Sequence, residues 1–424
     1  MTLRLLIRIL IPLLLGALSG HAAAAAFATE NAAASEPLSI LPPDPVVRQA
    51  LAGLPQLRAS TLNIELATSS RARLQAGPHE WSVRAGLSRR TEQGGERFNE
   101  QELVVERPLR WFGKAAKDAA IGDKGTFIAQ AAYEDAWHEA GRSLMKDWFD
   151  ALREITATAR LAEQHALAER LRSIAEKRVG AGDAAQLELL QADTESRRIG
   201  ALLQQSQLRA DQAMQVLAST YPGLPQPRAG VLPAPPTPQE SPDFWFDRIT
   251  GDNHELTLAQ AEADLYRLQA SRSASERMPD PTIGLRASRE RGGRENVYGV
   301  VIAFPLPGAA RAADASSAAL KAGMASERLA QTQVKVSLAA RRLITEASRS
   351  HAIWQSMQGI AQQSHRQAAT MMSAYQLGEA TLAEALNTRR QAHDAALLAE
   401  SAQIDALAAH ALLLLDAHQL WAVD

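Results

Sequence analysis

The sequence predicts a mainly α-helical protein with a smaller β component, built from two copies of one structural unit. A ten-residue pattern occurs twice, as GDAAQLELLQ at residues 182–191 and GEATLAEALN at residues 378–387. A proline-free stretch rich in helix formers precedes each copy, over residues 113–176 and 309–375. Two short segments with the period-2 alternation of β-strands precede each of these stretches. An order of elements that occurs twice indicates internal duplication.

Each copy of the pattern is predicted to be a corner between two long helices. Gly182 and Gly378 can adopt the positive φ that ends a helix. The acidic residue after each glycine, Asp183 or Glu379, then lies in the first turn of the next helix, where the helix dipole favours negative charge. We expect both glycines to serve the turn and to carry no chemistry of their own.

Residues 1–28 are predicted to be a secretory signal peptide. Arg4 and Arg8 form its basic start, residues 9–18 are apolar, and small residues offer cleavage sites before position 29. The apolar core is shorter than the ~20 residues that a membrane-spanning helix needs, and no later uncharged apolar run approaches ~18 residues, so we expect no transmembrane helix. The chain has no cysteine, which excludes disulfides, thiolate metal sites and a lipidated cysteine.

The first repeat is predicted to span residues 29–220. Residues 43–77 form a helix, with Pro55 as a point of interruption, and residues 80–89 and 101–107 form two strands. In the first strand Trp81, Val83, Ala85 and Leu87 share one face. The following helix would be ~90 Å long, and the helix after its corner runs to about residue 219. Its apolar stripe recurs at spacings of three and four: Tyr133, Trp137, Ala140, Leu144, Trp148, Leu152 and Ile155.

The second repeat, residues 244–424, follows a linker at residues 221–243 whose eight prolines exclude a helix. It repeats the order with a helix at residues 254–276, strands at 282–289 and 298–304, a long helix, a corner and a last helix. The last helix is expected to carry two heptad-spaced rows: Leu397, Ile404 and Ala411, and Leu407, Leu414 and Trp421.

Four amphipathic strands cannot close a barrel, because roughly eight strands is the smallest number that leaves a filled interior. Open strands of this kind would also leave unpaired edges. Only helices and closed barrels satisfy their backbone polar groups in lipid, so a mature chain that enters a membrane must do so through its strands. Three chains would supply twelve strands, and their long helices would extend that barrel as a cylinder. Trp81 and Tyr298 fit interfacial aromatics and simple packing residues equally well.

The whole mature chain resembles the TolC-like outer membrane efflux proteins. The resemblance rests on the duplicated order of elements, the segments YQLG at 375–378 and RVGAGD at 178–183, and the strand ends at Pro108 and Pro305. It implies a homotrimer with a twelve-stranded barrel in the outer membrane, continued by a periplasmic α-helical barrel. It also implies a periplasmic adaptor protein and an inner-membrane pump of the RND type as partners. The modest length and the absence of a lipidated cysteine make the chain look closer to the heavy-metal, CzcC-like branch.

The resemblance also places a periplasmic gate at the corners. Glu384 matches the first acidic position of the gate in the second half, and Tyr375 matches an aromatic residue that holds the mouth closed. Glu188 matches a related polar position in the first half, although an ordinary solvated helix carboxylate explains it equally well. Asn387 stands where a second acid is common, and Ala380 stands where some members carry an arginine. Both departures imply a less tightly latched closed state.

Other classes of protein fit the sequence less well. No nucleophile elbow, Walker loop, GxGxxG or HExxH motif is present, so we expect no catalytic residues, no cofactor and no enzyme. The ten histidines are scattered, so no metal site is expected, and a net charge of -2 gives no indication of nucleic-acid binding. A soluble periplasmic coiled-coil protein, such as an efflux adaptor, is the main alternative. An adaptor would show one helical hairpin, whereas this chain shows two, each after its own strand pair.

Overall fold

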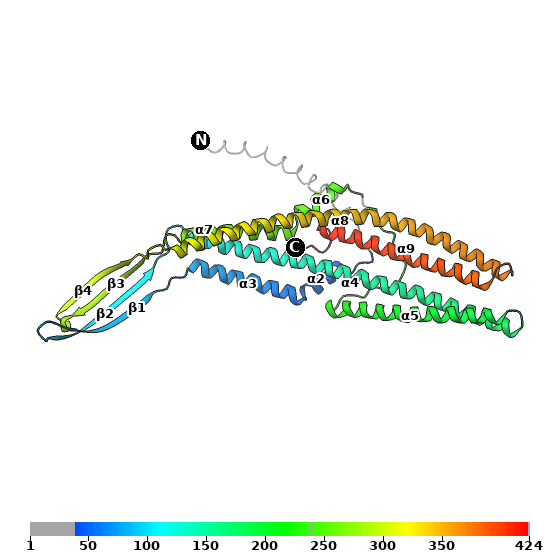
Figure 1. Cartoon of the computed structure of the whole chain (residues 1–424), viewed down its shortest axis with the longest axis horizontal. Helices are drawn as coiled ribbons and strands as arrows, with labels where there is room; N and C mark the ends of the chain where they lie inside the picture. Colours follow the sequence, from blue (N-terminus) through cyan, green and yellow to red (C-terminus); the bar gives the residue numbers. More distant parts are fainter. Residues whose placement is uncertain (1–38, 238, 423–424) are drawn as a thin grey trace, which may run out of the picture.

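The computed structural model describes residues 39–237 and 239–422 and shows an elongated molecule (Figure 1). A small sheet forms one end, the long helices run along the molecular axis, and the two helical corners lie at the opposite end. The predicted signal peptide at residues 1–28 lies outside the described residues. Elsewhere the predicted fold class, mainly helical with a few antiparallel strands, is confirmed.

The described part of the first half, from residue 39 on, contains four helices and two strands: α2 (Asp44–Ala52), α3 (Pro55–Ala76), β1 (Ser82–Thr91), β2 (Arg97–Pro108), α4 (Lys114–Gly180) and α5 (Gln186–Thr220). The helix expected over residues 43–77 is therefore two helices. Leu54 is extended, with ψ 135°, because the proline that follows it disfavours the helical conformation. Pro55 itself takes the first position of α3, where a missing N–H costs nothing.

The second half repeats this order as α6 (Pro242–Gly251), α7 (His254–Ser275), β3 (Thr282–Glu290), a 3₁₀ turn η2 (Arg291–Gly293), β4 (Glu295–Ala303), α8 (Ala309–Gln376) and α9 (Leu382–Asp416). Helix α6 begins inside the segment expected to be linker. The Ser241 side chain accepts a hydrogen bond from the Phe244 N–H, and proline stands at the first helical position, which together favour a helix start.

The four strands form one antiparallel sheet in the order β1-β2-β3-β4. Strand β2 of the first half pairs directly with β3 of the second half, with Val105 opposite Leu285. On the outer sides Val83 pairs with Val105, and Leu285 pairs with Val300. The register therefore brings the alternating apolar residues of all four strands to the same face. Strands β1 and β4 are the two edges.

The main hydrophobic core lies at the middle of the molecule. The predicted stripe of α4 is confirmed, because Trp137, Leu144, Trp148 and Leu152 are buried there against α2 and α9. Helices α6, α8 and α9 form a second cluster around Trp245. Helix α9 contributes to both clusters, which explains its apolar composition.

Among the described residues, α9 is the one helix that is long and apolar enough to cross a membrane, judged by length and composition alone. No helix of this kind was predicted from the sequence. Half of its apolar window is buried within the protein, as a core helix requires. The helix also ends earlier than the heptad pattern predicted, at Asp416. His418 has a positive φ of 57° and turns the chain, so that Trp421 lies outside the helix. Its backbone oxygen accepts a hydrogen bond of 2.9 Å from the Trp137 indole N–H.

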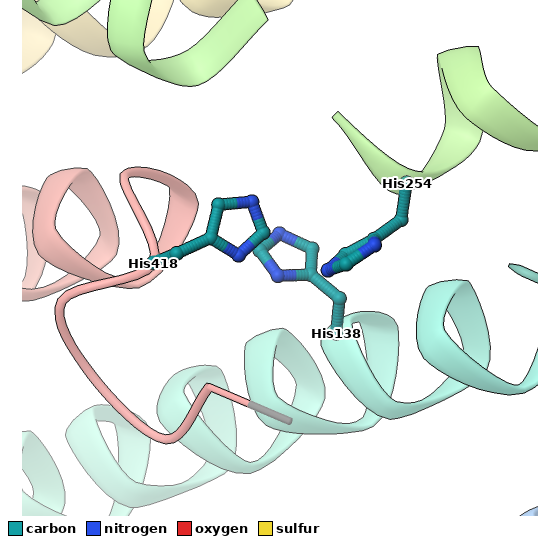
Figure 2. Close-up of side chains that lie close together, drawn as sticks. All are labelled: His138, His254 and His418. Carbon is teal, nitrogen blue, oxygen red and sulfur yellow. The ribbon is translucent and has the colours of Figure 1, made fainter. Parts of the chain in front are cut away.

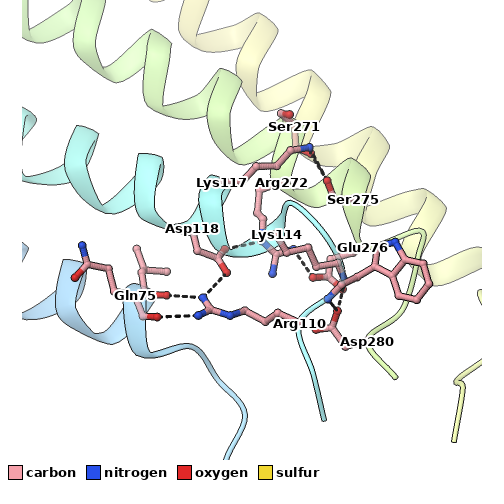
Figure 3. A network of polar contacts seen from close by, with 12 residues as sticks. Gln75, Arg110, Lys114, Lys117, Asp118, Ser271, Arg272, Ser275, Glu276 and Asp280 are labelled. Carbon is pink, nitrogen blue, oxygen red and sulfur yellow. Dashed lines mark hydrogen bonds and ion pairs between the residues drawn. The ribbon is translucent and has the colours of Figure 1, made fainter. Parts of the chain in front are cut away.

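A network of charged side chains joins both halves where the helices meet the sheet (Figure 3). Lys114 at the start of α4 is fully buried, and its Nζ lies 2.8 Å from Asp280 and 3.0 Å from Glu276. Asp118, one turn further along α4, accepts hydrogen bonds from Arg110 and Arg272. These contacts connect α4 of the first half to the end of α7 in the second half.

Candidate functional site

The two predicted corners lie side by side at the tip of the helices and have the same backbone geometry. Gly182 and Gly378 both have φ 81°, a conformation that strains any residue with a Cβ. The N–H after each glycine returns to the preceding helix, from Asp183 to the Arg178 oxygen at 2.8 Å and from Glu379 to the Ala374 oxygen at 2.9 Å. This is the Schellman arrangement that satisfies the last carbonyl groups of a helix.

The helices that leave the corners begin differently. Thr381 caps α9 by accepting a hydrogen bond from the Glu384 N–H, and the Glu384 carboxylate accepts one of 2.9 Å from the Thr381 N–H. These two bonds form a capping box. The Thr381 N–H, followed by its hydroxyl, holds the pKa of the exposed Glu384 carboxyl below its usual range. In α5 the equivalent cap position is Ala185, whose methyl group cannot accept a hydrogen bond, so no capping box forms and Glu188 can bind elsewhere.

Glu188 instead connects the two corners. The Tyr375 hydroxyl at the end of α8 donates a hydrogen bond of 2.9 Å to the Glu188 carboxylate and accepts one of 2.6 Å from the Arg178 guanidinium. The guanidinium also lies 3.6 Å from Glu188 and 5.4 Å from the centre of the Tyr375 ring. These three side chains, which we call the corner tie, link the α4–α5 hairpin to the α8–α9 hairpin.

The corner tie is half-buried over a small apolar cluster of Ala175, Ala192 and Leu382. Burial raises the pKa of Tyr375, the Glu188 carboxylate raises it further, and Arg178 opposes both. The Tyr375 hydroxyl therefore remains protonated at neutral pH and can donate its hydrogen bond to Glu188.

The structure brings together two of the four gate residues expected from the sequence, Tyr375 and Glu188. Glu384 is occupied by its own capping box, and Asn387 is exposed, with its side-chain oxygen accepting a hydrogen bond of 3.2 Å from Arg390. Sequence reasoning missed Arg178, the third member of the corner tie. Arg178 lies in the last turn of α4, where the helix dipole by itself favours a positive charge. The local sequence therefore gave no sign that Arg178 binds a tyrosine.

The sheet at the other end of the molecule exposes an apolar face. Leu87 is 86% exposed, and its neighbours on that face are also exposed: Trp81, Val83, Leu103, Ile283, Leu285, Tyr298, Val300 and Ile302. The opposite face carries cross-strand ion pairs, including Arg84 with Glu106 at 2.8 Å and Arg286 with Glu102 at 2.8 Å. A monomeric soluble protein rarely exposes a contiguous apolar patch of this extent.

The structure also gathers three histidines that the sequence shows as scattered. His138, His254 and His418 each offer a ring nitrogen, and these atoms lie within 4.8 Å of one another (Figure 2). No metal site was expected from the sequence because the histidines are scattered along the chain, and that reasoning did not detect this cluster. Ligand spacing along the chain detects local sites, whereas these three residues come from α4, the start of α7 and the segment after α9.

The fold is similar to that of known outer membrane channels. The outer membrane channel CmeC of Campylobacter jejuni matches with a TM-score of 0.73 and 14% identity, covering 89% of this chain and 86% of that one. The outer membrane protein VceC of Vibrio cholerae matches with a TM-score of 0.73 and 15% identity, covering 89% and 95%. The open state of the outer membrane channel MtrE of Neisseria gonorrhoeae matches with a TM-score of 0.58 and 16% identity, covering 89% of each chain. No family model and no curated protein matches the sequence. The chain therefore has the fold of these channels.

Proposed function

We propose that this chain, which has the fold of outer membrane channels, is a passive outer membrane duct of a tripartite efflux system. The observation that carries the proposal is the two-sided sheet. An exposed apolar face suits lipid, and an ion-paired face suits a water-filled lumen, which is the alternation of a transmembrane β-barrel. A soluble adaptor would have no use for the apolar face, so this observation disfavours the main alternative.

Three copies of the chain complete the barrel. Four strands leave β1 and β4 as unpaired edges, and three sheets joined edge to edge would give twelve strands without an edge. The 67 residues of α4 extend ~100 Å at 1.5 Å per residue, a length suited to a periplasmic tunnel below the barrel. In this arrangement residues 1–28 direct export, residues 29–220 and 244–424 are the two repeats, and residues 221–243 connect them.

The corners form the periplasmic gate in this proposal. Three copies of the corner tie would close the mouth by holding the two hairpins of each chain together. Glu384 and Asn387 would face the opening, and Gly182 and Gly378 would shape the turns. Three carboxylates from Glu384 around one axis would attract cations and disfavour anions, as an acidic ring does in cation channels.

Transport through such a duct takes its energy from partners, and no catalysis by this chain is proposed. The partners inferred from the resemblance are a periplasmic adaptor and an inner-membrane pump of the RND type. The substrate class inferred from it is heavy-metal cations. Deletion of the gene should therefore lower the metal concentration that cells tolerate and leave their tolerance of detergents and drugs unchanged. Sensitisation to drugs alone would contradict the metal assignment, and ATP hydrolysis by the isolated protein would contradict a passive duct.

Cysteine labelling tests the barrel directly, because the chain has no cysteine of its own. Leu285 and Arg286 are neighbours on β3 that point to opposite faces. In intact outer membranes, Leu285→Cys should resist a water-soluble maleimide, and Arg286→Cys should react. Both should react after the protein is unfolded in denaturant. Equal labelling of the two variants in membranes would show that the apolar face does not contact lipid.

Epitope tags test the orientation of the barrel. The loop between β1 and β2 contains Gly94, and the turn between β3 and β4 contains Gly292. Tags inserted at these points should be reachable by antibody on intact cells. If both tags were reachable only after permeabilisation, the proposed topology would be wrong.

A further inference from the structure

The three histidines at the middle of the molecule come from three separate segments. His138 lies on α4, His254 is the first residue of α7, and His418 follows the end of α9. Their ring centres lie 4.7 to 5.8 Å apart, and His254 and His418 form the closest pair (Figure 2). No residue of the corner tie or of the sheet belongs to this cluster.

Each ring has an oxygen partner on the protein. His138 Nε2 lies 3.2 Å from an Asp416 carboxylate oxygen, and His254 Nδ1 lies 3.8 Å from a Glu134 carboxylate oxygen. His418 makes a hydrogen bond to the backbone of Asp252. Asp416 is itself held by a hydrogen bond of 2.8 Å from Arg142. Histidines that bind a metal ion characteristically give their other ring nitrogen to a carboxylate or a carbonyl group, which fixes the orientation of the ring.

The surroundings suit a cation bound by neutral imidazole rings. All three rings are partly buried, and one nitrogen of each lies within 4.8 Å of the others. A neutral imidazole is the form that ligates a metal ion. A cavity of about 10 Å³ lies between the three rings and Trp421, which is about the volume of one small ion or water. An adjacent cleft of about 290 Å³ offers a route of entry. Four carboxylates line it, Asp135, Glu139, Glu255 and Asp416, together with Arg142 and Lys335, which pair with Asp416 and Glu255.

We propose that His138, His254 and His418 bind one divalent transition-metal ion of the zinc type. Imidazole suits zinc, copper and nickel, and three histidines with one open position form a common zinc site. Tetrahedral coordination at 2.0–2.1 Å places the ligand nitrogens about 3.4 Å apart. The ligand atoms here lie within 4.8 Å, so binding draws them together by roughly 1–1.5 Å, which side-chain rotation supplies.

The ion would act as a cross-link between the two halves of the chain. It would join α4 of the first half to the start of α7 and to the C-terminal segment, whose Trp421 oxygen is already bound to Trp137 on α4. This role is independent of what the duct carries, and it does not require the corner tie to be a gate.

Metal content tests the site. The full chain, prepared without a polyhistidine tag, would be stripped with a chelator, loaded with zinc sulfate, dialysed and analysed by elemental mass spectrometry. We expect one zinc ion per chain. Cobalt(II) in place of zinc should give the intense visible absorption of a tetrahedral site. Retention of no metal after dialysis would overturn the proposal.

Three variants separate this site from adventitious binding. His254→Gln and His418→Asn should each lower zinc affinity by more than about 100-fold, beyond the usual effect of losing an outer partner. Asparagine is chosen at 418 because it tolerates the positive φ of that residue. His365→Gln, at an exposed histidine on α8, is the matched control and should bind zinc as the parent does. Circular dichroism and oligomer migration would establish that each variant folds. Parental affinity in folded His254→Gln and His418→Asn would show that the cluster is not the metal site.

Discussion

The corner tie predicts that removal of a single oxygen atom opens the proposed gate. Tyr375→Phe keeps the ring over Arg178 and removes the hydroxyl that donates to Glu188 and accepts from Arg178. Hydrogen bonds to charged groups contribute about 1.5–3 kcal/mol each when buried. Here the side chains of Arg178 and Glu188 are 39% and 26% exposed, so solvent reduces each contribution to about 1 kcal/mol.

The direct contact between Arg178 and Glu188 survives the substitution and retains part of this energy. We therefore expect the closed state to lose about 1.4 kcal/mol per chain relative to an open state in which the hairpins separate. That difference corresponds to roughly a tenfold change in the ratio of open to closed states. Because the proposed channel contains three chains, the expected result is a rise of at least about tenfold in the open-to-closed ratio of single channels in planar bilayers, and of about 1000-fold if the three chains open together.

A matched variant and a double variant make this expectation refutable. Tyr266→Phe removes the same hydroxyl from α7, far from the corners, and should leave the open probability unchanged. Tyr375→Phe combined with Glu188→Gln should change the open probability by less than the sum of the two single effects, because both variants break the same contact. If Tyr375→Phe behaved like the Tyr266→Phe control, the corner tie would not hold the gate closed.

Three further predictions concern the gate charge and the network at the junction of helices and sheet. Glu384→Gln keeps the capping box and removes the charge. It should weaken block by trivalent cations in single-channel recordings more than Glu188→Gln does. Unchanged block would show that Glu384 does not line the mouth. Lys114→Met should lower the free energy of unfolding by about 3 kcal/mol in guanidinium titrations, because it removes a fully buried cation from two partly buried carboxylates, Asp280 and Glu276. The exposed Lys146→Met should cost less than about 0.5 kcal/mol, and equal losses would contradict a structural role for Lys114. Burial alone would raise the pKa of Asp280, but hydrogen bonds from Lys114, His79 and the Trp111 N–H outweigh burial and hold it at about 2. This lowered pKa contributes about 2 kcal/mol of stability that is present above pH ~4 and lost as the pH falls toward 2, so Asp280→Asn should flatten the acid limb of stability against pH.

Local patterns in the sequence predicted most of the fold. Alternation located all four strands to within a few residues, and the absence of proline located both long helices. The corners were predicted from Gly182 and Gly378, because a glycine after a long helix is typical of a helix end with a positive φ. Both glycines have that conformation in the structure. The differences are also local in origin. Pro55 divides the first helix, and the turn at His418 ends the last helix before Trp421.

The tertiary structure alone decided which side chains meet. Glu384 and Glu188 occupy the same place in the repeated pattern, yet one caps its own helix and the other binds Tyr375, because Thr381 in one copy is Ala185 in the other. The histidine cluster has no counterpart in any local pattern. Its members meet through the packing of α4, α7 and the C-terminal segment, and such contacts depend on the path of the whole chain. Periodicity and turn chemistry act over a few residues, so they determine elements and corners, whereas contacts between distant residues arise only when those elements pack.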